Sequence, residues 1–286
     1  MRIVLATAAA LVAFAANSLL CRAALGGGRA DAASFTGLRL ASGAAVLILL
    51  SRGTGGARGG SWPSAAALFV YAAAFSFAYF FLSAGVGALL LFGAVQVTMI
   101  GAGIAAGERP APSVWAGLVL ALAGLVHLSS RGAHVPSPGG TALMLSAGVA
   151  WGVYSLRGRR AGPPLPATAD NFRRAAPLAA LVWILSALGG GMHLTPAGAA
   201  LAVTSGVITS GLGYVAWYAA LPHLTAARAA VLQLSVPVLA ATGGVLLLGE
   251  VLTARLVVAG TAILAGIALA TRKPRVSSES RPAKAA

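Results

Sequence analysis

Long apolar runs of similar length make up most of the chain, and short turn segments separate them. A helix of about 20 residues crosses the roughly 30 Å hydrocarbon core of a bilayer. Ten runs have about this length, and they cover residues 3–21, 33–51, 62–83, 86–106, 112–130, 140–157, 166–188, 196–218, 226–248 and 254–271, each bound holding to within several residues. The pattern therefore predicts an all-α integral membrane protein with ten transmembrane helices.

The breaks between the runs have the composition of turns. They read GGGRAD, RGTGGARGG, GERPAP, RGAHVPSPGG, RAGPPLP and GGGMHLTP, and Gly and Pro at this density end helices. Small residues also recur four positions apart inside the runs, in the pairs Gly103 and Gly107, Gly148 and Gly152, and Gly206 and Ser210. Such pairs are typical of helices that pack closely in lipid, so they predict packing and carry no information on a substrate.

The first run, MRIVLATAAALVAFAANS, has the basic start, apolar stretch and small residues of a secretory signal peptide. The same apolar character recurs along the whole chain, and this run is needed as one member of the repeat described below. We therefore expect it to remain as the first span.

Composition agrees with a membrane protein and excludes other classes. Hydrophobic residues make up 58% of the chain and charged residues 9%, whereas soluble domains carry about 25% charged residues. The formal net charge of +15 raises nucleic acid as an alternative partner, because a basic protein can neutralise phosphates. The basic residues lie between apolar runs and not on one water-facing surface, so we expect a lipid bilayer and no nucleic acid as partner.

Cysteine and histidine give no sign of a metal site or cofactor. The single cysteine, Cys21, excludes an intrachain disulfide, and we expect it to be a small packing residue. The four histidines lie in loops or near the ends of runs, at no metal-ligand spacing; they are His127, His134, His193 and His223. We expect neither a metal ion nor a cofactor.

Basic residues also orient the chain. Ten spans place both termini on one side of the membrane, and the side with more Lys and Arg in its loops is cytoplasmic. If the N-terminus is inside, thirteen basic residues of the loops and tails lie inside: Arg2, Arg52, Arg58, Arg109, Arg157, Arg159, Arg160, Arg228, Arg272, Lys273, Arg275, Arg281 and Lys284. Four lie outside: Arg22, Arg29, Arg131 and Arg255. We therefore expect both termini in the cytoplasm of a bacterium, with the protein in its inner membrane and residues 273–286 as a disordered basic tail.

An internal repeat relates the two halves of the chain. Residues 101–124 align with residues 243–266 at a constant offset, and the shared GE dipeptide places Glu108 over Glu250. Each half holds five spans, an odd number, so the second half must be inserted upside down. The sequence thus predicts two inverted five-helix repeats, residues 1–132 and 133–272, a common plan in secondary transporters with a site at the repeat interface.

With these features the chain resembles the EamA family of the drug/metabolite transporter superfamily. The resemblance rests on the GE dipeptide that closes the fourth span of each half, on Arg39 near the start of the second span, on YVAWYAAL at 214–221 and on RAAVLQLSVPVLAATGGVLLLGE at 228–250. It implies a ten-helix metabolite carrier, often an exporter, with a central cavity that opens alternately to each side. The chain departs from the family where the fourth span has Val95 and Gln96 in place of the proline that Pro237 supplies in the second half.

Polar and amphipathic side chains inside the spans are the candidates for substrate binding. A charged side chain at a helix centre costs about 2.5–3.5 kcal/mol on insertion scales, so such residues are often functional. Arg39 lies about 9 Å inside its span at 1.5 Å per residue; it either binds an anionic group, or extends to the interface, or ties down a neighbouring helix. The same position in the second half holds Arg173 and Arg174, and Asp170 on the same helical face is expected to neutralise them locally.

Uncharged candidates complete the predicted site. Asn17, Gln96, Thr98 and Gln233 either line a cavity or bond to a neighbouring helix. The aromatic candidates are Tyr79, Trp151, Tyr154, Tyr214 and Trp217, which either line the cavity or anchor the chain at the membrane interface.

The function that these patterns favour is secondary transport of a small organic metabolite (an amino acid, amine, nucleoside-like or drug-like molecule), and we expect the direction to be outward. A membrane-embedded enzyme would need clustered acids, histidines or an activated nucleophile, which the sequence does not have, and a structural membrane protein is a third alternative. The absence of a GxxxxGK[ST] loop excludes direct ATP drive by this chain. A coupling proton, the substrate, the direction and the oligomeric state stay open.

The two GE corners are predicted to be structural. The expected topology places Glu108 and Glu250 on opposite membrane faces, so they cannot act together on one substrate. A carboxylate is favoured at a helix N-terminus, and we expect each one to satisfy backbone N–H groups at the start of the next helix. Pro237 is likewise assigned a structural role.

Overall fold

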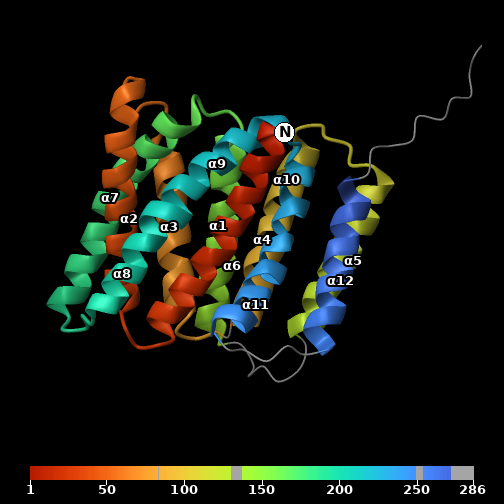
Figure 1. Cartoon of the computed structure of the whole chain (residues 1–286). Helices are drawn as coiled ribbons and strands as arrows, with labels where there is room; N and C mark the ends of the chain where they lie inside the picture. Colours follow the sequence, from red (N-terminus) through yellow and green to blue (C-terminus); the bar gives the residue numbers. More distant parts are fainter. Residues whose placement is uncertain (83, 130–136, 249–253, 272–286) are drawn as a thin grey trace, which may run out of the picture.

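The computed structural model describes residues 1–82, 84–129, 137–248 and 254–271, and regular structure in this part of the chain is helical except for one bridge between Ala30 and Leu194. The helices are α1 (Arg2–Leu25), α2 (Ala32–Ser51), α3 (Trp62–Ala78), α4 (Ala84–Ala105), α5 (Pro112–Ser129), α6 (Pro138–Gly158), α7 (Pro164–Leu188), α8 (Pro196–Thr204), α9 (Gly213–Ala220), α10 (Ala226–Gln233), α11 (Ser235–Leu248) and α12 (Ala254–Thr271). A π-helical segment, η2 (Ser205–Leu212), joins α8 to α9 in one rod, and α10 and α11 form a second composite rod. Counted in this way, the described residues form ten helical rods, as predicted (Figure 1).

Several of these rods are long and apolar enough to cross a membrane. Among the described residues, four have both the length and the composition of a span: Arg2–Leu25, Ala32–Thr54, Pro196–His223 and Ala226–Leu247. Large apolar side chains also face outward along the bundle: Val97 is 77% exposed, Leu188 81% and Leu246 75%. Such a surface is stable in lipid and not in water, so the protein is a multi-pass membrane protein.

Local sequence explains where the helices begin. The side chains of Asp31, Ser61, Ser137, Thr195 and Thr225 each accept a hydrogen bond from a backbone N–H in the first turn of the helix that follows. Proline occupies an early helical position in α3, α6 and α8, where its missing N–H removes no hydrogen bond. These N-caps satisfy donors that lipid would leave unpaired.

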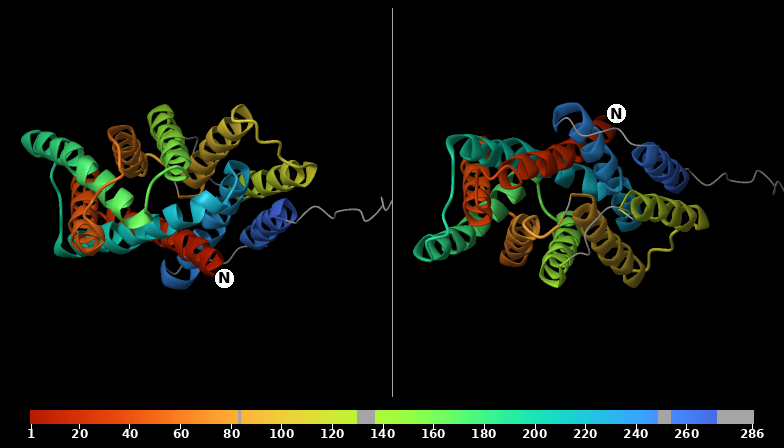
Figure 2. Two further views of the ribbon diagram at one scale, coloured as in Figure 1. Left: turned by 90° about the horizontal axis from the view of Figure 1, so that it is seen from above. Right: turned by 90° about the horizontal axis from the view of Figure 1, so that it is seen from below.

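The packing of the rods has the two-fold pattern that an inverted repeat predicts. The second helices of the two halves, α2 and α7, pack together, and so do the fifth helices, α5 and α12. The third helix of the first half, α3, contacts α6, the first helix of the second half; likewise α9, in the third rod of the second half, contacts α1. The fourth rods follow the same pattern, since α4 contacts α6 and α11 contacts α1. In Figure 2 the α5–α12 pair forms one edge of the bundle, and α2, α7 and α8 lie at the opposite edge. The boundary between the halves near residue 132 stays a prediction.

Two of the predicted glycine positions are points of close helix contact. A Cβ on Gly148 of α6 would clash with the carbonyl oxygen of Leu91 in α4, and one on Gly206 of η2 would clash with the carbonyl oxygen of Arg39 and the side chain of Ser42 in α2. Glycine is therefore required by sterics at both crossings.

The fourth rods of the two halves differ at the position where one has Pro237 and the other Val95. The second-half rod is interrupted at Leu234 between α10 and α11. Pro237 is buried three residues later, and because proline has no N–H it cannot bond the carbonyl of Gln233. In the first half Val95 takes the place of this proline, and α4 runs without a break from Ala84 to Ala105.

The first GE corner is structural, but its partner is not the one expected. Gly107 has a φ of +86°, which lets the Glu108 N–H bond back to the Gly103 carbonyl at 2.8 Å and ends α4. The Glu108 carboxylate then accepts hydrogen bonds from the N–H groups of Ala226 (3.0 Å) and Ala227 (3.4 Å) at the start of α10. The prediction that it caps the next helix, α5, is wrong, because the turn directs the side chain toward the other half of the chain.

Glu108 also forms an ion pair at 3.1 Å with Arg159, which follows α6. One carboxylate thus joins three segments at one face of the bundle. Glu250, the other GE corner, lies outside the described residues.

We expect Gly206→Leu to lower the stability of the folded protein, because the side chain would enter the contact between η2 and α2. Overpacking costs roughly 1–3 kcal/mol, and a backbone carbonyl as neighbour places this site at the upper end. The measurement is the apparent Tm of detergent-solubilised protein. Gly101→Leu is the matched control, since Gly101 is an exposed helical glycine with no atom within 4 Å of its Cβ position. Equal Tm values for the two variants would contradict the assigned packing.

We expect Glu108→Ala to lower Tm more than Glu108→Gln does. Alanine removes the cap of α10 and the ion pair, whereas the glutamine oxygen still accepts the backbone hydrogen bonds; loss of a cap costs about 0.5–2 kcal/mol. Arg109→Ala, at the exposed neighbouring position, should leave Tm unchanged. An equal loss in the alanine and glutamine variants would assign the effect to the ion pair with Arg159 instead of the cap.

Candidate functional site

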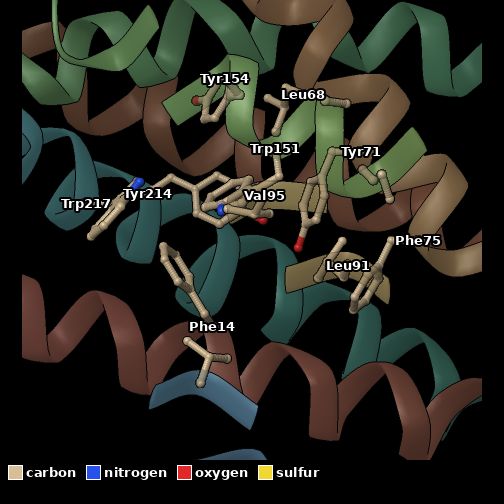
Figure 3. Packing of buried hydrophobic residues seen from close by; sticks show 14 of the residues in the cluster. Phe14, Leu68, Tyr71, Phe75, Leu91, Val95, Trp151, Tyr154, Tyr214 and Trp217 are labelled. Carbon is tan, nitrogen blue, oxygen red and sulfur yellow. The ribbon is translucent and has the colours of Figure 1, made fainter. Parts of the chain in front are cut away.

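Aromatic side chains from four rods meet at the centre of the bundle (Figure 3). They are Phe14 of α1, Tyr71 and Phe75 of α3, Trp151 and Tyr154 of α6, and Tyr214 and Trp217 of α9, and we call this set the aromatic cage. The Trp151 ring is its centre, with centroid distances of 4.8 Å to Tyr71, 4.8 Å to Tyr214 and 5.0 Å to Phe14. Because α1 and α3 belong to the first predicted half and α6 and α9 to the second, the cage lies where the halves meet.

A small cavity lies beside the cage. It is lined by Phe14, Ser18, Tyr71, Phe75, Leu91, Phe92, Trp151 and Val236, and its volume is about 20 Å³. This space holds about one water molecule. In this conformation the rings therefore pack against one another, and a larger solute would enter only if they moved.

Hydrogen bonds from the indole groups fix two of the rings. The Trp151 Nε1–H donates to Gln233 Oε1 at 2.5 Å, and the Trp217 Nε1–H donates to Ser155 Oγ at 3.0 Å. The Gln233 amide also donates to the Ala229 carbonyl at 3.2 Å. Gln233 is the last residue of α10, so the central ring of the cage is bonded to the break in the fourth rod of the second half.

Arg39 of α2 lies against the cage and is fully buried. Its Nε–H donates to Ser210 Oγ and one of its Nη2 hydrogens to the Tyr214 hydroxyl, both at 2.7 Å. Its guanidinium carbon is 5.5 Å from the centroid of the Tyr71 ring. Of the alternatives that the sequence left open, extension to the interface is excluded, and the contacts join Arg39 to the rod formed by α8, η2 and α9.

The π-helical segment η2 carries the polar partners of two predicted site residues. Besides Ser210, which binds Arg39, it holds Ser205 and Thr209, whose hydroxyls donate to Asn17 Oδ1 at 2.6 and 3.2 Å. Such segments are rare and often occur at functional sites. Asn17 thus bonds α1 to this rod.

Three further candidates do not belong to the cage. Gln96 donates to the Ala230 carbonyl at 2.8 Å and so bonds α4 to α10, and Thr98 donates to the Ala94 carbonyl of its own helix at 2.8 Å. Tyr79 follows the end of α3 and packs on the edge of the cage, 4.9 Å from Phe75. The structure thus joins Arg39, Trp151, Tyr154, Tyr214, Trp217 and Gln233 at one place and leaves Asn17, Gln96 and Thr98 in contacts between or within helices. Their roles toward a substrate stay predictions.

The second arginine position is neutralised locally, as predicted. Asp170 pairs with Arg173 at 2.7 Å and with Arg174 at 3.2 Å. It also accepts the Gly60 N–H at 3.1 Å, which ties α7 to the loop before α3. Only the first half therefore places an arginine in the centre of the described bundle.

A larger cavity of about 700 Å³ opens at the face that carries the N-terminus, and we call it the vestibule. Its lining includes Ser61, Ser64, Glu108, Arg157, Arg159, Arg160 and Asn171. Asn171 donates to the Tyr218 hydroxyl at 3.4 Å, which in turn donates to the Tyr154 carbonyl at 3.2 Å. Asn171 lines the vestibule and Tyr154 belongs to the cage, so Tyr218 connects the two through these hydrogen bonds.

The sequence reasoning missed Phe14, Tyr71 and Phe75, which supply the first half of the cage, and Ser210, which orients Arg39. A signal was available for α3: Tyr71 and Phe75 are four residues apart, and thus on one helical face, as Trp151 and Tyr154 are at a spacing of three. Within the described residues no group of three or more His, Cys, Asp or Glu side chains is placed to hold a metal ion.

Comparisons with known proteins identify the family of the chain. The EamA-like transporter family matches residues 138–272. An uncharacterized protein of Pseudomonas aeruginosa is 56% identical over 271 residues, which cover 94% of each chain. The threonine/homoserine exporter RhtA of Escherichia coli is 36% identical over 179 residues, and the match covers 58% of this chain and 57% of RhtA.

Two further matches cover more of the chain than the RhtA match does. An uncharacterized transporter of Archaeoglobus fulgidus is 29% identical over 198 residues, with 68% of this chain and 70% of that protein covered. A solved crystal structure superposes with a TM-score of 0.73 at 23% sequence identity, covering 92% of this chain and 97% of the other. This likeness shows that the fold is one already observed. The chain belongs to the EamA-like transporter family.

Proposed function

We propose that the protein is a secondary transporter that exports a small organic metabolite from the cytoplasm by alternating access around the aromatic cage. The observation that carries the proposal is the meeting of buried rings from both halves with a buried guanidinium, beside a polar vestibule at one face. Aromatic faces bind the apolar part of a solute, and a few polar groups fix its orientation. The family is one of transporters and not of enzymes.

The vestibule supports the cytoplasmic face as the loading side. Arg157, Arg159 and Arg160 line it, and loops rich in arginine lie in the cytoplasm. The chain's N-terminus is at the same face (Figure 1). We therefore assign this face, and both termini, to the cytoplasmic side of a bacterial inner membrane.

The relative with a named activity supports export of small polar metabolites. RhtA is named as an exporter of threonine and homoserine. Its match covers little more than half of either chain, so we extend from it the direction of transport and the small size of the solute, and not the identity of its substrates.

The break between α10 and α11 supplies a place for movement. Broken helices near the membrane centre line the sites of many secondary transporters. Here Gln233, at the break, holds the Nε1–H of Trp151. We propose that a change at the break moves Trp151, and that this movement opens the cage toward one face and closes it toward the other.

We expect purified protein in liposomes to catalyse counterflow of a labelled solute from a panel of amino acids, amines and nucleosides. Trp151→Ala should slow exchange at least tenfold, because it removes the central ring and the hydrogen bond to Gln233. Counterflow needs no coupling ion, so this assay detects transport by either a coupled or an uncoupled carrier.

Trp115→Ala is the matched control, since this tryptophan of α5 is 44% exposed on the outside of the bundle and should leave exchange unchanged. Failure of the wild-type protein to exchange any member of the panel would refute the transport proposal. Equal loss in the two variants would refute the assignment of the cage.

A further inference from the structure

The Arg39 guanidinium is a buried charge in the middle of the bundle. Arg39 is 0% exposed, and it lies seven residues after the start of α2, or about 10 Å along the helix. A cation removed from water is costly unless an opposite charge compensates it. The position of Arg39 therefore raises the question of which group supplies that charge.

No acidic residue of the described chain does so. The sequence holds five acidic residues, and the described residues include three of them. Asp31 caps α2 and accepts the His193 N–H, Glu108 caps α10 and pairs with Arg159, and Asp170 pairs with Arg173 and Arg174. Each is engaged elsewhere, and Arg39 has neutral partners only.

The neutral partners orient the guanidinium and leave one nitrogen free. Ser210 and Tyr214 hold Nε and Nη2, while Nη1 has no hydrogen-bond partner among the described residues. The hydroxyl of Tyr154 is a second buried group without a partner in this part of the structure, and its ring centroid is 6.1 Å from that of Tyr214. Buried donors of this kind are costly unless something accepts from them.

We propose that Arg39 is the anion anchor of the transport site and that the exported solutes carry a carboxylate. The inference rests on the transport function proposed above. A carboxylate has one negative charge, which matches one guanidinium, and its oxygens accept the N–H groups of arginine with favourable geometry. The free Nη1 binds the carboxylate, and the rings of Tyr71 and Tyr214 beside it contact the rest of the solute.

The rod that carries Ser210 positions this anchor. Gly206 brings η2 against the backbone of α2 at Arg39, and Ser210, four residues on in the same π-helical segment, then reaches Nε. Ser210 therefore acts on the solute through Arg39 as a positioning residue.

Counterflow with matched pairs of solutes tests the inference. The probes are threonine and phenylalanine, each compared with its amide, which keeps the ammonium and side chain and loses the negative charge. A phosphate ester of similar size tests for a general anion site. We expect wild-type protein to exchange each acid at least tenfold faster than its amide and to exclude the ester.

Arg39→Gln should abolish the preference for the acid. Arg39→Lys keeps a positive charge, so it should retain part of the preference while the KM for the acid rises. Arg173→Gln is the matched control, because Arg173 occupies the corresponding position in the second half and pairs with Asp170 at the bundle surface. This control should keep the preference of the wild type.

Binding in detergent separates anchoring from folding. If Arg39 holds the carboxylate, the acid raises the Tm of the wild-type protein and the amide does not, whatever the stability of the Arg39 variants. Equal exchange of acid and amide by the wild type, or an intact preference in Arg39→Gln, overturns the inference and leaves transport standing. Exchange of no solute refutes the transport function itself.

Discussion

The absence of water from the bilayer is the constraint on which this structure depends. Backbone polar groups in the hydrocarbon core must find their partners within the protein, and several buried polar side chains bond different rods together. Asn17 bonds α1 to η2, Gln96 bonds α4 to α10, and Trp151 bonds α6 to α10 through Gln233. Close packing at small residues brings helices together in lipid, and these hydrogen bonds add specific contacts between neighbouring rods.

The architecture could be predicted from the sequence because it follows from strong, local patterns. Ten apolar runs predicted the ten helical rods of the described residues, and the GE dipeptides at a constant offset led us to expect a repeat. The break near Pro237 has an equally local cause, although the apolar pattern predicted one uninterrupted span over residues 226–248. Glycine spacing identified close contacts without naming the partners, which depend on how the helices are arranged in space.

The site was harder to predict because its partners are distant in the sequence. Polarity inside a span identified Arg39 and Gln233, and aromatic residues with a polar tip identified Trp151 and Tyr214, but Phe14 has neither property. The hydroxyl that orients Arg39 is 171 residues away at Ser210, in a π-helical turn that no local pattern indicated. Glu108 shows the same limit: its helix-capping role was predictable, while its partner helix depended on the meeting of the two halves.

The asymmetry between the halves has a physical meaning. An inverted repeat could place an arginine from each half at the centre, and two such cations would repel each other across a few side chains. Asp170 prevents this by holding Arg173 and Arg174 at the surface, so one uncompensated charge remains at the cage. The same half that neutralises its arginine also carries the interrupted rod and the bond from Gln233 to Trp151. In the proposed mechanism, charge recognition therefore belongs to one half and movement to the other, and the aromatic cage is where a bound solute would couple them.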